Sequence, residues 1–233
     1  MLPLRRVELR IAASKPWSFG LEQVAEMWPR LKATGFASIS PLAIQPMQPL
    51  PFLAPATAVA FTHSNGTLVE LTPEYVAAVC DVSKSESYPR FGAMAGALAE
   101  VAEALGIEEE QVKLANLVYV NKVDEERGSQ ADTVEEYFAH VWWNKKFVSG
   151  SSKIHEAALN FNRAPFDFRL RVLGYDASES GPGFWLETSA GRYIDHDLGW
   201  LHSLVTVHDE LQKFFIELLT ENARKRWGFA DGS

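Results

Sequence analysis

The residues with the clearest potential for metal chemistry are three histidines near the C-terminus, His196, His202 and His208, at six-residue intervals. Two metal ligands on one helix normally lie three or four residues apart, so that both side chains share a face. Six residues turn a helix through about 600° and place the side chains on different sides. The chain has no HExxH motif, and its one cysteine excludes a zinc–thiolate cage. The sequence therefore predicts no metal site.

Nucleophilic and nucleotide chemistry also lack their usual motifs. No GxSxG elbow is present, and Cys80 has no nearby histidine in the sequence. Neither GxGxxG nor a P-loop occurs. The Gly/Ser segment 149–152, between Lys146 and Lys153, suits a solvated loop better than a phosphate cradle. We expect no cofactor, and we favour a protein that is not an enzyme.

The charge balance bears on the class of partner. The net charge is −8, which repels phosphate backbones and anionic membranes. The basic cluster 224–226 ends the last predicted helix, where cations complement the helix dipole without any ligand. The N-terminal MLPLRRVELR lacks the apolar run of a secretory signal, and no stretch approaches a membrane span. We expect a cytoplasmic protein with no membrane partner, and the charge disfavours nucleic acid as a partner.

A first candidate site is the sheet face that predicted helices leave uncovered. Alternation in two predicted strands places Arg169, Arg171, Trp185 and Glu187 there. Arginine and tryptophan are enriched at binding hot spots, which points to a protein partner or to a homodimer. The alternative is a wet face stabilised by cross-strand ion pairs, such as Arg169 or Arg171 with Glu187. The sequence leaves both interpretations open.

A second candidate site is a pocket between the sheet and the C-terminal helix. The strand VKLANLVYVNKVD contains two asparagines, although asparagine is depleted in strands. Alternation places Tyr119 and Asn121 on one face and Asn116 on the other. With His208 and Asp209 from the last helix, a phenol, an amide and an imidazole could converge on a small ligand. A buried histidine with one hydrogen-bond partner is the alternative role for His208.

The first half of the chain predicts a strand, a helix, a hairpin and further helices. In RVELRIA, Val7, Leu9 and Ile11 share one face. The following elements are a helix over about 19–34 that Pro29 is expected to kink or divide, a proline-rich extended segment from 41 to 55, a hairpin around Asn65-Gly66, a short helix that starts at Thr72 and carries Cys80, and a helix over about 89–105.

The second half repeats this order. It predicts a strand over 112–124, a helix from the capping-box pattern at Thr133, a strand over 166–174, its hairpin partner over 184–194 and a long helix over about 199–227. We therefore predict an α+β fold: an antiparallel sheet from two pseudo-repeated βαββα halves, about 1–110 and 111–233, with helices on one face. We favour a single domain, and the alternative is two domains divided near 125–132.

Several short motifs resemble a sporadically distributed family of uncharacterised bacterial proteins of about this size. They are the Pro3-Leu4 start, LVEL at 68–71, the helix start Tyr88-Pro89-Arg90-Phe91, the strand LVYVNKV at 117–123, and His208 followed by Phe214, Phe215 and Thr220. The chain departs from the family where Val118 and Lys122 stand in place of two arginines. The resemblance implies the same fold and a bacterial, cytoplasmic origin, and it carries no activity with it.

The sequence thus favours a non-catalytic binding or adaptor protein that recognises a protein partner through the open sheet face. By analogy with the family, it would belong to a multi-gene bacterial system. A small-ligand-binding protein or enzyme is the first alternative, and a nucleic-acid-binding accessory is the second.

Overall fold

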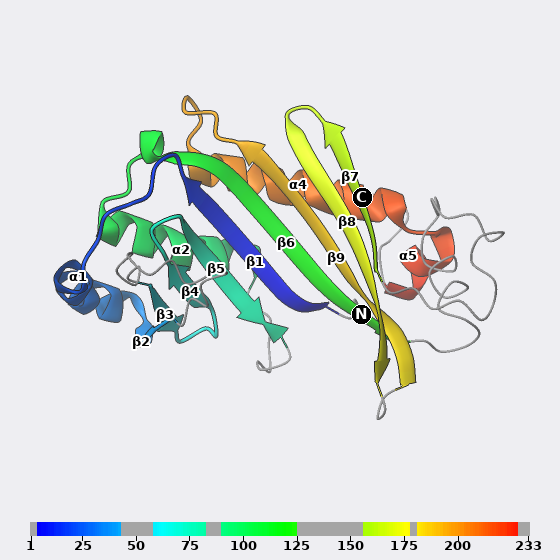
Figure 1. The fold of residues 1–233 in the computed structure, drawn as a ribbon, viewed down its shortest axis with the longest axis horizontal. Coiled ribbons are helices and arrows are strands. Elements are labelled where there is room, and N and C mark those ends of the chain that lie inside the picture. Colours follow the sequence, from blue (N-terminus) through cyan, green and yellow to red (C-terminus); the bar gives the residue numbers. More distant parts are fainter. Residues whose placement is uncertain (1–3, 43–57, 83–89, 125–155, 178–180, 228–233) are drawn as a thin grey trace, which may run out of the picture. The chain divides into compact units, whose positions relative to one another are not determined.

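Nine strands form one sheet in the order β2-β3-β4-β5-β1-β6-β9-β8-β7 (Figure 1). The computed structural model describes residues 4–42, 58–82, 90–124, 156–177 and 181–227. Its elements are β1 (Leu4–Ala13), α1 (Leu21–Thr34), β2 (Phe36–Pro41), β3 (Val59–His63), β4 (Leu68–Leu71), β5 (Tyr75–Asp81), α2 (Phe91–Leu105), the 3-10 helix η2 (Glu109–Gln111), β6 (Val112–Asp124), β7 (Glu156–Arg163), β8 (Phe166–Ala177), β9 (Gly181–Tyr193), α4 (Trp200–Leu218) and α5 (Glu221–Trp227). The predicted α+β fold with an antiparallel sheet and a C-terminal helix is confirmed.

The strand order follows the repeated plan. In the first half, β1 lies next to β5, the last strand of that half; in the second, β6 lies next to β9, again the last strand. The first half contains two strands that the sequence did not predict, β2 and β5, and the second half contains one, β7. The helix predicted from Thr133 and the proline-rich segment beyond Leu42 lie outside the described residues.

The chain forms two compact units, each built from more than one stretch. Unit 1 contains Met1–Arg6, Val118–Ala190 and Val207–Ser233, and unit 2 contains Val7–Leu117 and Gly191–Thr206. The boundaries pass through β6, β9 and α4 rather than through a linker. Neither the single-domain prediction nor a division near 125–132 is tested by this arrangement.

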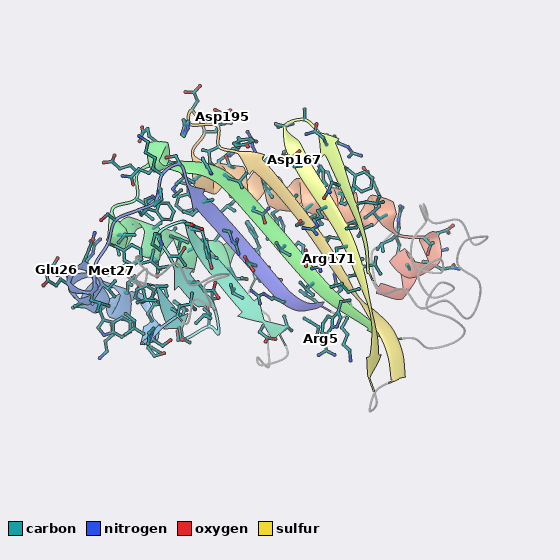
Figure 2. All side chains as sticks on the ribbon, viewed as in Figure 1. Arg5, Glu26, Met27, Asp167, Arg171 and Asp195 are labelled. Carbon is teal, nitrogen blue, oxygen red and sulfur yellow. The ribbon has the colours of Figure 1, made fainter. Side chains whose placement is uncertain are left out.

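The core of unit 2 contains the predicted apolar face of β1. Val7, Leu9 and Ile11 are fully buried. Helix α2 packs against β4 and β5, and α1 packs against α2 and β2 (Figure 1). On α1, Met27 faces this core whereas Glu26 is exposed (Figure 2). Pro29 does not divide α1, since helix runs on both sides of it. The burial of Val24, Met27 and Leu31 offsets the lost backbone hydrogen bond.

The short helix predicted after Thr72 is wrong, because residues 75–81 form the strand β5. The Thr72 hydroxyl accepts hydrogen bonds from the N–H groups of Glu74 and Tyr75, at 3.2 and 3.0 Å. This is the bonding of a helix N-cap, but here it closes the turn between β4 and β5, with Leu71 opposite Val76. Cys80 therefore lies on a strand between β4 and β1 in which every residue from Val76 to Cys80 is buried.

In unit 1, β7 and β8 form a hairpin in continuous register from Glu156↔Leu173 to Arg163↔Phe166. Phe166, Phe168, Leu170 and Val172 of β8 are buried, as predicted from their alternation. The predicted long C-terminal helix is two helices. It ends at Leu218, and Thr220 then begins α5, where its hydroxyl accepts a hydrogen bond from the Ala223 N–H at 3.1 Å.

Candidate functional site

The polar sheet face of unit 1 contains one of the ion pairs that the sequence suggested. The guanidinium of Arg171 on β8 lies 3.8 Å from the carboxylate of Glu187 on β9. Both side chains are about a quarter to a third exposed, at 30% and 26%. Asp167 lies on the same face of β8 as Arg171 (Figure 2) and accepts a hydrogen bond from Asn162 at 2.6 Å. Part of this face is therefore satisfied within the chain.

Arg169 and Trp185 complete the first predicted site. Arg169 is exposed and lies opposite Asn160 on β7 rather than beside Glu187. Its guanidinium makes no ion pair with any described residue. Trp185 is half-buried on β9. The structure thus brings Arg171 and Glu187 together and leaves Arg169, next to the end of the sheet, as a cation that a partner can reach.

The residues of the second predicted site lie in unit 1. His208 is half-buried, and its Nδ1 lies 3.0 Å from Oδ1 of the exposed Asp209. Because consecutive helical residues point about 100° apart, this contact runs along the helix surface. Tyr119 is half-buried and Asn121 is 2% exposed.

Asn116 and Asn121 have different environments. A Cβ added at Gly191 would lie 3.0 Å from Nδ2 of Asn116, so a larger residue where β9 passes this amide would force the Asn116 side chain to shift. Asn121 is on the opposite face by alternation, as predicted, and its Oδ1 is buried without a hydrogen-bond partner among the described residues. Thr188 shares this property: it is fully buried and its hydroxyl is unpartnered. Unsatisfied buried polar atoms are rare in proteins, and each one calls for a physical explanation.

An apolar groove in unit 1 was not predicted from the sequence. It has a volume of about 490 Å³ and lies between the β7–β8 hairpin and the end of α4. Its apolar lining is formed by Leu159, Phe161, Phe168, Phe214 and Leu218. The ring of Phe214 lies 5.6 Å from that of Phe161 and 4.6 Å from that of Phe168.

The rim of this groove is polar. Arg163 and Glu217 form an ion pair across it at 3.2 Å. Phe161 is 38% exposed, which is unusual for a phenylalanine. One sequence signal could have identified this groove: Leu159 and Phe161 alternate with Asn160 and Asn162.

A second polar cluster lies in unit 2. Glu8 and Arg10 of β1 form an ion pair, and the Arg10 guanidinium lies 4.2 Å from the centre of the Tyr75 ring. The Tyr75 hydroxyl donates a hydrogen bond to Glu70 at 3.4 Å. Burial, and then the negative charge of Glu70, raise the pKa of Tyr75 above its ordinary value. The phenol therefore stays neutral, whereas the Nε of Arg10 is buried without a hydrogen-bond partner among the described residues.

Neither the search for metal-ligand groups nor the comparison with known proteins assigns a role to these sites. Across the described residues, no group of three or more His, Cys, Asp and Glu side chains could hold a metal ion. Within those same residues, no helix is long and apolar enough to cross a membrane. No protein-family model matches the chain, and no curated protein matches it. The family resemblance of the short motifs stays a prediction.

Proposed function

We propose that this protein is a non-catalytic binding or adaptor protein, and that its partner adds an extended segment to the free edge of β7. The observation that supports this proposal is the combination of an edge strand with an apolar groove beneath it. Among the described residues, strand β7 is the last in the sheet order, and all eight of its residues pair with β8 on one side only. An edge of this kind offers unpaired backbone groups to a partner strand.

The register identifies the backbone groups available for docking. Ala164 and Pro165 form the turn, so Arg163 and Phe166 are the closing pair of the hairpin. In a two-residue hairpin that pair exchanges hydrogen bonds, and the pattern then alternates along the strand. The N–H and C=O groups of Ala158, Asn160 and Asn162 consequently point away from β8. A docked strand would pair with these three residues.

The side chains around the edge indicate the chemistry of the segment. On one face, a docked strand would place every second side chain beside Phe161 and Leu218, where the groove is apolar. On the other face it would meet Asn160 and the exposed guanidinium of Arg169. The expected segment therefore alternates apolar and polar residues and carries a carboxylate opposite Arg169. Such pairing combines main-chain affinity with side-chain specificity.

A peptide selection tests this proposal. A phage library of linear peptides would be panned on the full chain, and the selected peptide measured by biolayer interferometry against two variants of one residue. Asn160→Pro removes an outward N–H, whereas Asn160→Ser retains it. We expect Asn160→Pro to weaken binding at least about tenfold and Asn160→Ser to change it less than about twofold. Equal binding by Asn160→Pro would exclude strand addition at β7.

The polar sheet face is the alternative docking surface. A partner that binds there would be sensitive to Arg171→Glu combined with Trp185→Ala and insensitive to Asn160→Pro. A second copy of this chain is an alternative occupant of the edge, and it would appear as a dimer in sedimentation that Asn160→Pro converts to monomer. We also propose a cytoplasmic location, which the free, buried thiol of Cys80 supports. The net charge of −8 argues against nucleic acid.

A second candidate function, binding of a small ligand beside Asn121, is favoured by one observation. The Oδ1 of Asn121 and the hydroxyl of Thr188 are both buried, and neither has a hydrogen-bond partner in the part of the chain that the structure describes. A bound polar group would satisfy them and remove that cost. Native mass spectrometry of the purified protein, compared with its denatured mass, tests this function. Extra mass that Asn121→Ala abolishes would support it, and identical masses in both conditions would count against it.

A further inference from the structure

Exposed apolar side chains cluster in one short part of unit 2. Among the described residues, seven large apolar side chains are exposed, and four of these lie between positions 193 and 205: Tyr193, Leu198, Leu201 and Val205. Their exposed fractions range from 41% for Val205 to 71% for Tyr193. Single exposed apolar residues are normal on a protein surface, whereas a group of them marks an interaction site. This cluster therefore points to an occupant.

Three of these side chains follow the outer side of α4, and we call Leu198, Leu201 and Val205 the α4 stripe. Leu201 and Val205 are four residues apart, so they lie about 40° apart around the helix and share a face. Leu198 lies in the turn before the helix, where its N–H donates to the Asp195 carbonyl at 3.0 Å. The side chains that α4 buries in this unit lie on the other side of the helix: Trp200, Ser203 and Leu204.

Carboxylates lie beside the first turn of α4. Glu109 of η2 accepts a hydrogen bond from the Trp200 N–H at 2.7 Å. This contact offsets the positive end of the α4 dipole and fixes η2 next to the start of the helix. Glu108 and Glu110, on either side of Glu109, are exposed. The α4 stripe therefore begins at an acidic surface.

Two more carboxylates lie in the loop between β9 and α4. They are Asp195, labelled in Figure 2, and the exposed Asp197, whose N–H donates to Oδ1 of Asp195 at 3.2 Å. The stretches 108–113 and 191–206 together contain five carboxylates, against the cations Lys113 and Arg192. Arg192 directs its Nε to the carbonyl of Tyr193, at 3.3 Å. The surroundings of the α4 stripe thus carry an excess of negative charge.

The helix and its charges select among possible occupants. An extended segment would gain no main-chain hydrogen bonds here, because the backbone groups of α4 are bonded within the helix. A second copy of this chain would bring the same carboxylates and a net charge of −8, which opposes association. A helix with an apolar face and flanking cations matches both the stripe and its charge.

We propose that the α4 stripe docks a basic amphipathic helix of a partner protein. Apolar side chains of that helix pack on Leu198, Leu201 and Val205, and its lysines or arginines face the carboxylates of 108–110 and 195–197. This surface is in unit 2, whereas the edge of β7 is in unit 1. The proposal does not depend on docking at β7, and the two surfaces together would let one chain hold two partners.

The experiment measures fluorescence anisotropy of a labelled peptide titrated with the full chain. The probe is a helical peptide of leucine and lysine, about 18 residues or five turns long, with all leucines on one face. One control peptide carries glutamate in place of lysine, and the other has the same composition in scrambled order. We expect saturable binding of the probe at about 10 µM or tighter. Both controls should bind at least about tenfold more weakly.

Variants of the chain then locate the probe. Leu201→Gln combined with Val205→Gln should weaken binding at least about tenfold, because it removes the apolar contact. Both side chains are exposed and glutamine is a good helix former, so the fold is retained. Leu21→Gln is the matched control: Leu21 is also exposed, but it lies on α1, and its loss should change binding less than about twofold.

The contribution of charge is tested at the loop before α4. Asp195→Asn combined with Asp197→Asn removes two charges and keeps the oxygen that accepts the hydrogen bond from the backbone of residue 197. We expect this variant to bind the leucine–lysine peptide about threefold to fivefold more weakly, as exposed charges do. High salt should remove that difference, because it screens exposed charges.

Four results would overturn the proposal. The first is a probe that does not saturate by about 100 µM. The second is a glutamate peptide that binds as tightly as the lysine peptide, which would make the stripe purely apolar. The third is equal binding by the Leu201→Gln, Val205→Gln variant, which would place the probe elsewhere. The fourth is a dimer in sedimentation that this variant converts to monomer, which would assign the stripe to a second copy. Asn160→Pro should leave the probe affinity unchanged, so failure at one surface is distinguishable from failure at the other.

Discussion

The sheet ends in two edge strands that are built differently. Strand β2, in unit 2, has an irregular register between Phe36 and Ser38 and ends in Pro41. The Leu42 N–H donates a hydrogen bond to the Ala58 carbonyl at 2.9 Å. Because backbone groups alternate in direction along a strand, those of position 41 point away from β3. A proline there removes an outward N–H and leaves the hydrogen bonds to β3 intact. Strand β7, in unit 1, has neither an irregular register nor a proline.

This difference distinguishes an edge strand that is protected against pairing with other chains from one that is available for it. Bulges and prolines are the means by which proteins block edge-to-edge pairing, and β2 has both. Strand β7 keeps a regular register of eight residues and places the half-exposed Phe161 beside an apolar groove. No described residue pairs with the outer edge of β7, and an exposed edge of this kind is prone to pairing with other chains. The contrast therefore supports β7 as a docking element and makes β2 its natural control.

The largest expected loss of stability follows the removal of a buried phenylalanine at each edge of the sheet. Phe214 is 6% exposed and packs against Phe161 of β7 and Phe168 of β8. Phe36, a residue of β2 itself, is 2% exposed and packs against Phe61 of β3. We expect Phe214→Ala and Phe36→Ala each to lower the free energy of unfolding by about 3 kcal/mol. Guanidinium denaturation measures both. A loss below about 1 kcal/mol for Phe214→Ala would show that the packing of Phe214 beneath the groove does not stabilise the fold.

The next effect tests the direction of the backbone groups in β7. We expect Phe161→Pro, which removes an N–H bonded to β8, to cost about 3 kcal/mol. Asn160→Pro removes an outward N–H and should cost less than about 1 kcal/mol. The two residues are adjacent, so each variant is the control for the other. If the larger loss belonged to Asn160→Pro, the assignment of outward groups in β7 would be reversed.

A smaller loss of stability is expected from a variant at the groove that distinguishes peptide binding from folding. Phe161 is already 38% exposed, so Phe161→Ser should cost only about 1 kcal/mol of stability. The same variant should weaken the selected peptide about tenfold, because it removes the apolar contact beside the docked strand. Interferometry and denaturation on one protein sample give both values. Loss of stability without loss of binding would place the peptide elsewhere.

The smallest effect concerns β5, the interior strand that contrasts with both edges. Burial, and then Asp81, raise the pKa of the Cys80 thiol above its ordinary value of 9.0. The thiol thus stays neutral in the folded chain at a pH where the unfolded chain ionises it. Stability from this source is complete below pH 9.0 and is lost as the pH rises through the higher folded value.

The readout is the urea midpoint at about pH 8 and about pH 10, where an ordinary thiol changes charge. Cys80→Ala should lose less stability between these two pH values than the unmodified chain. Tyr75 also has a raised pKa and remains in both proteins, so it contributes equally to each. Equal losses in the two proteins would mean that the thiol ionises as freely in the fold as outside it.

Much of the fold follows from local pattern. The alternation in RVELRIA and FDFRLRVLG reflects a strand with one buried face, and both segments are strands. Asn65-Gly66 forms the predicted turn, where Asn65 accepts a hydrogen bond from the Thr67 N–H at 2.9 Å. Gly35 and Gly106 end their helices with positive φ, at 115° and 73°. In each case the deciding interactions lie within a few residues of each other.

The tertiary structure decided what local pattern leaves ambiguous. The hydroxyl of Thr72 makes the same bonds at a helix start and at a tight turn, and only pairing with β4 selects the strand β5. Pro29 is tolerated because the helix around it is packed. No sequence pattern distinguishes a strand in the middle of a sheet from one at its edge, so the available edge of β7 appears only in the strand order. A cavity beside Trp17 is likewise assembled from two stretches that are distant in the chain, 14–23 and 105–111.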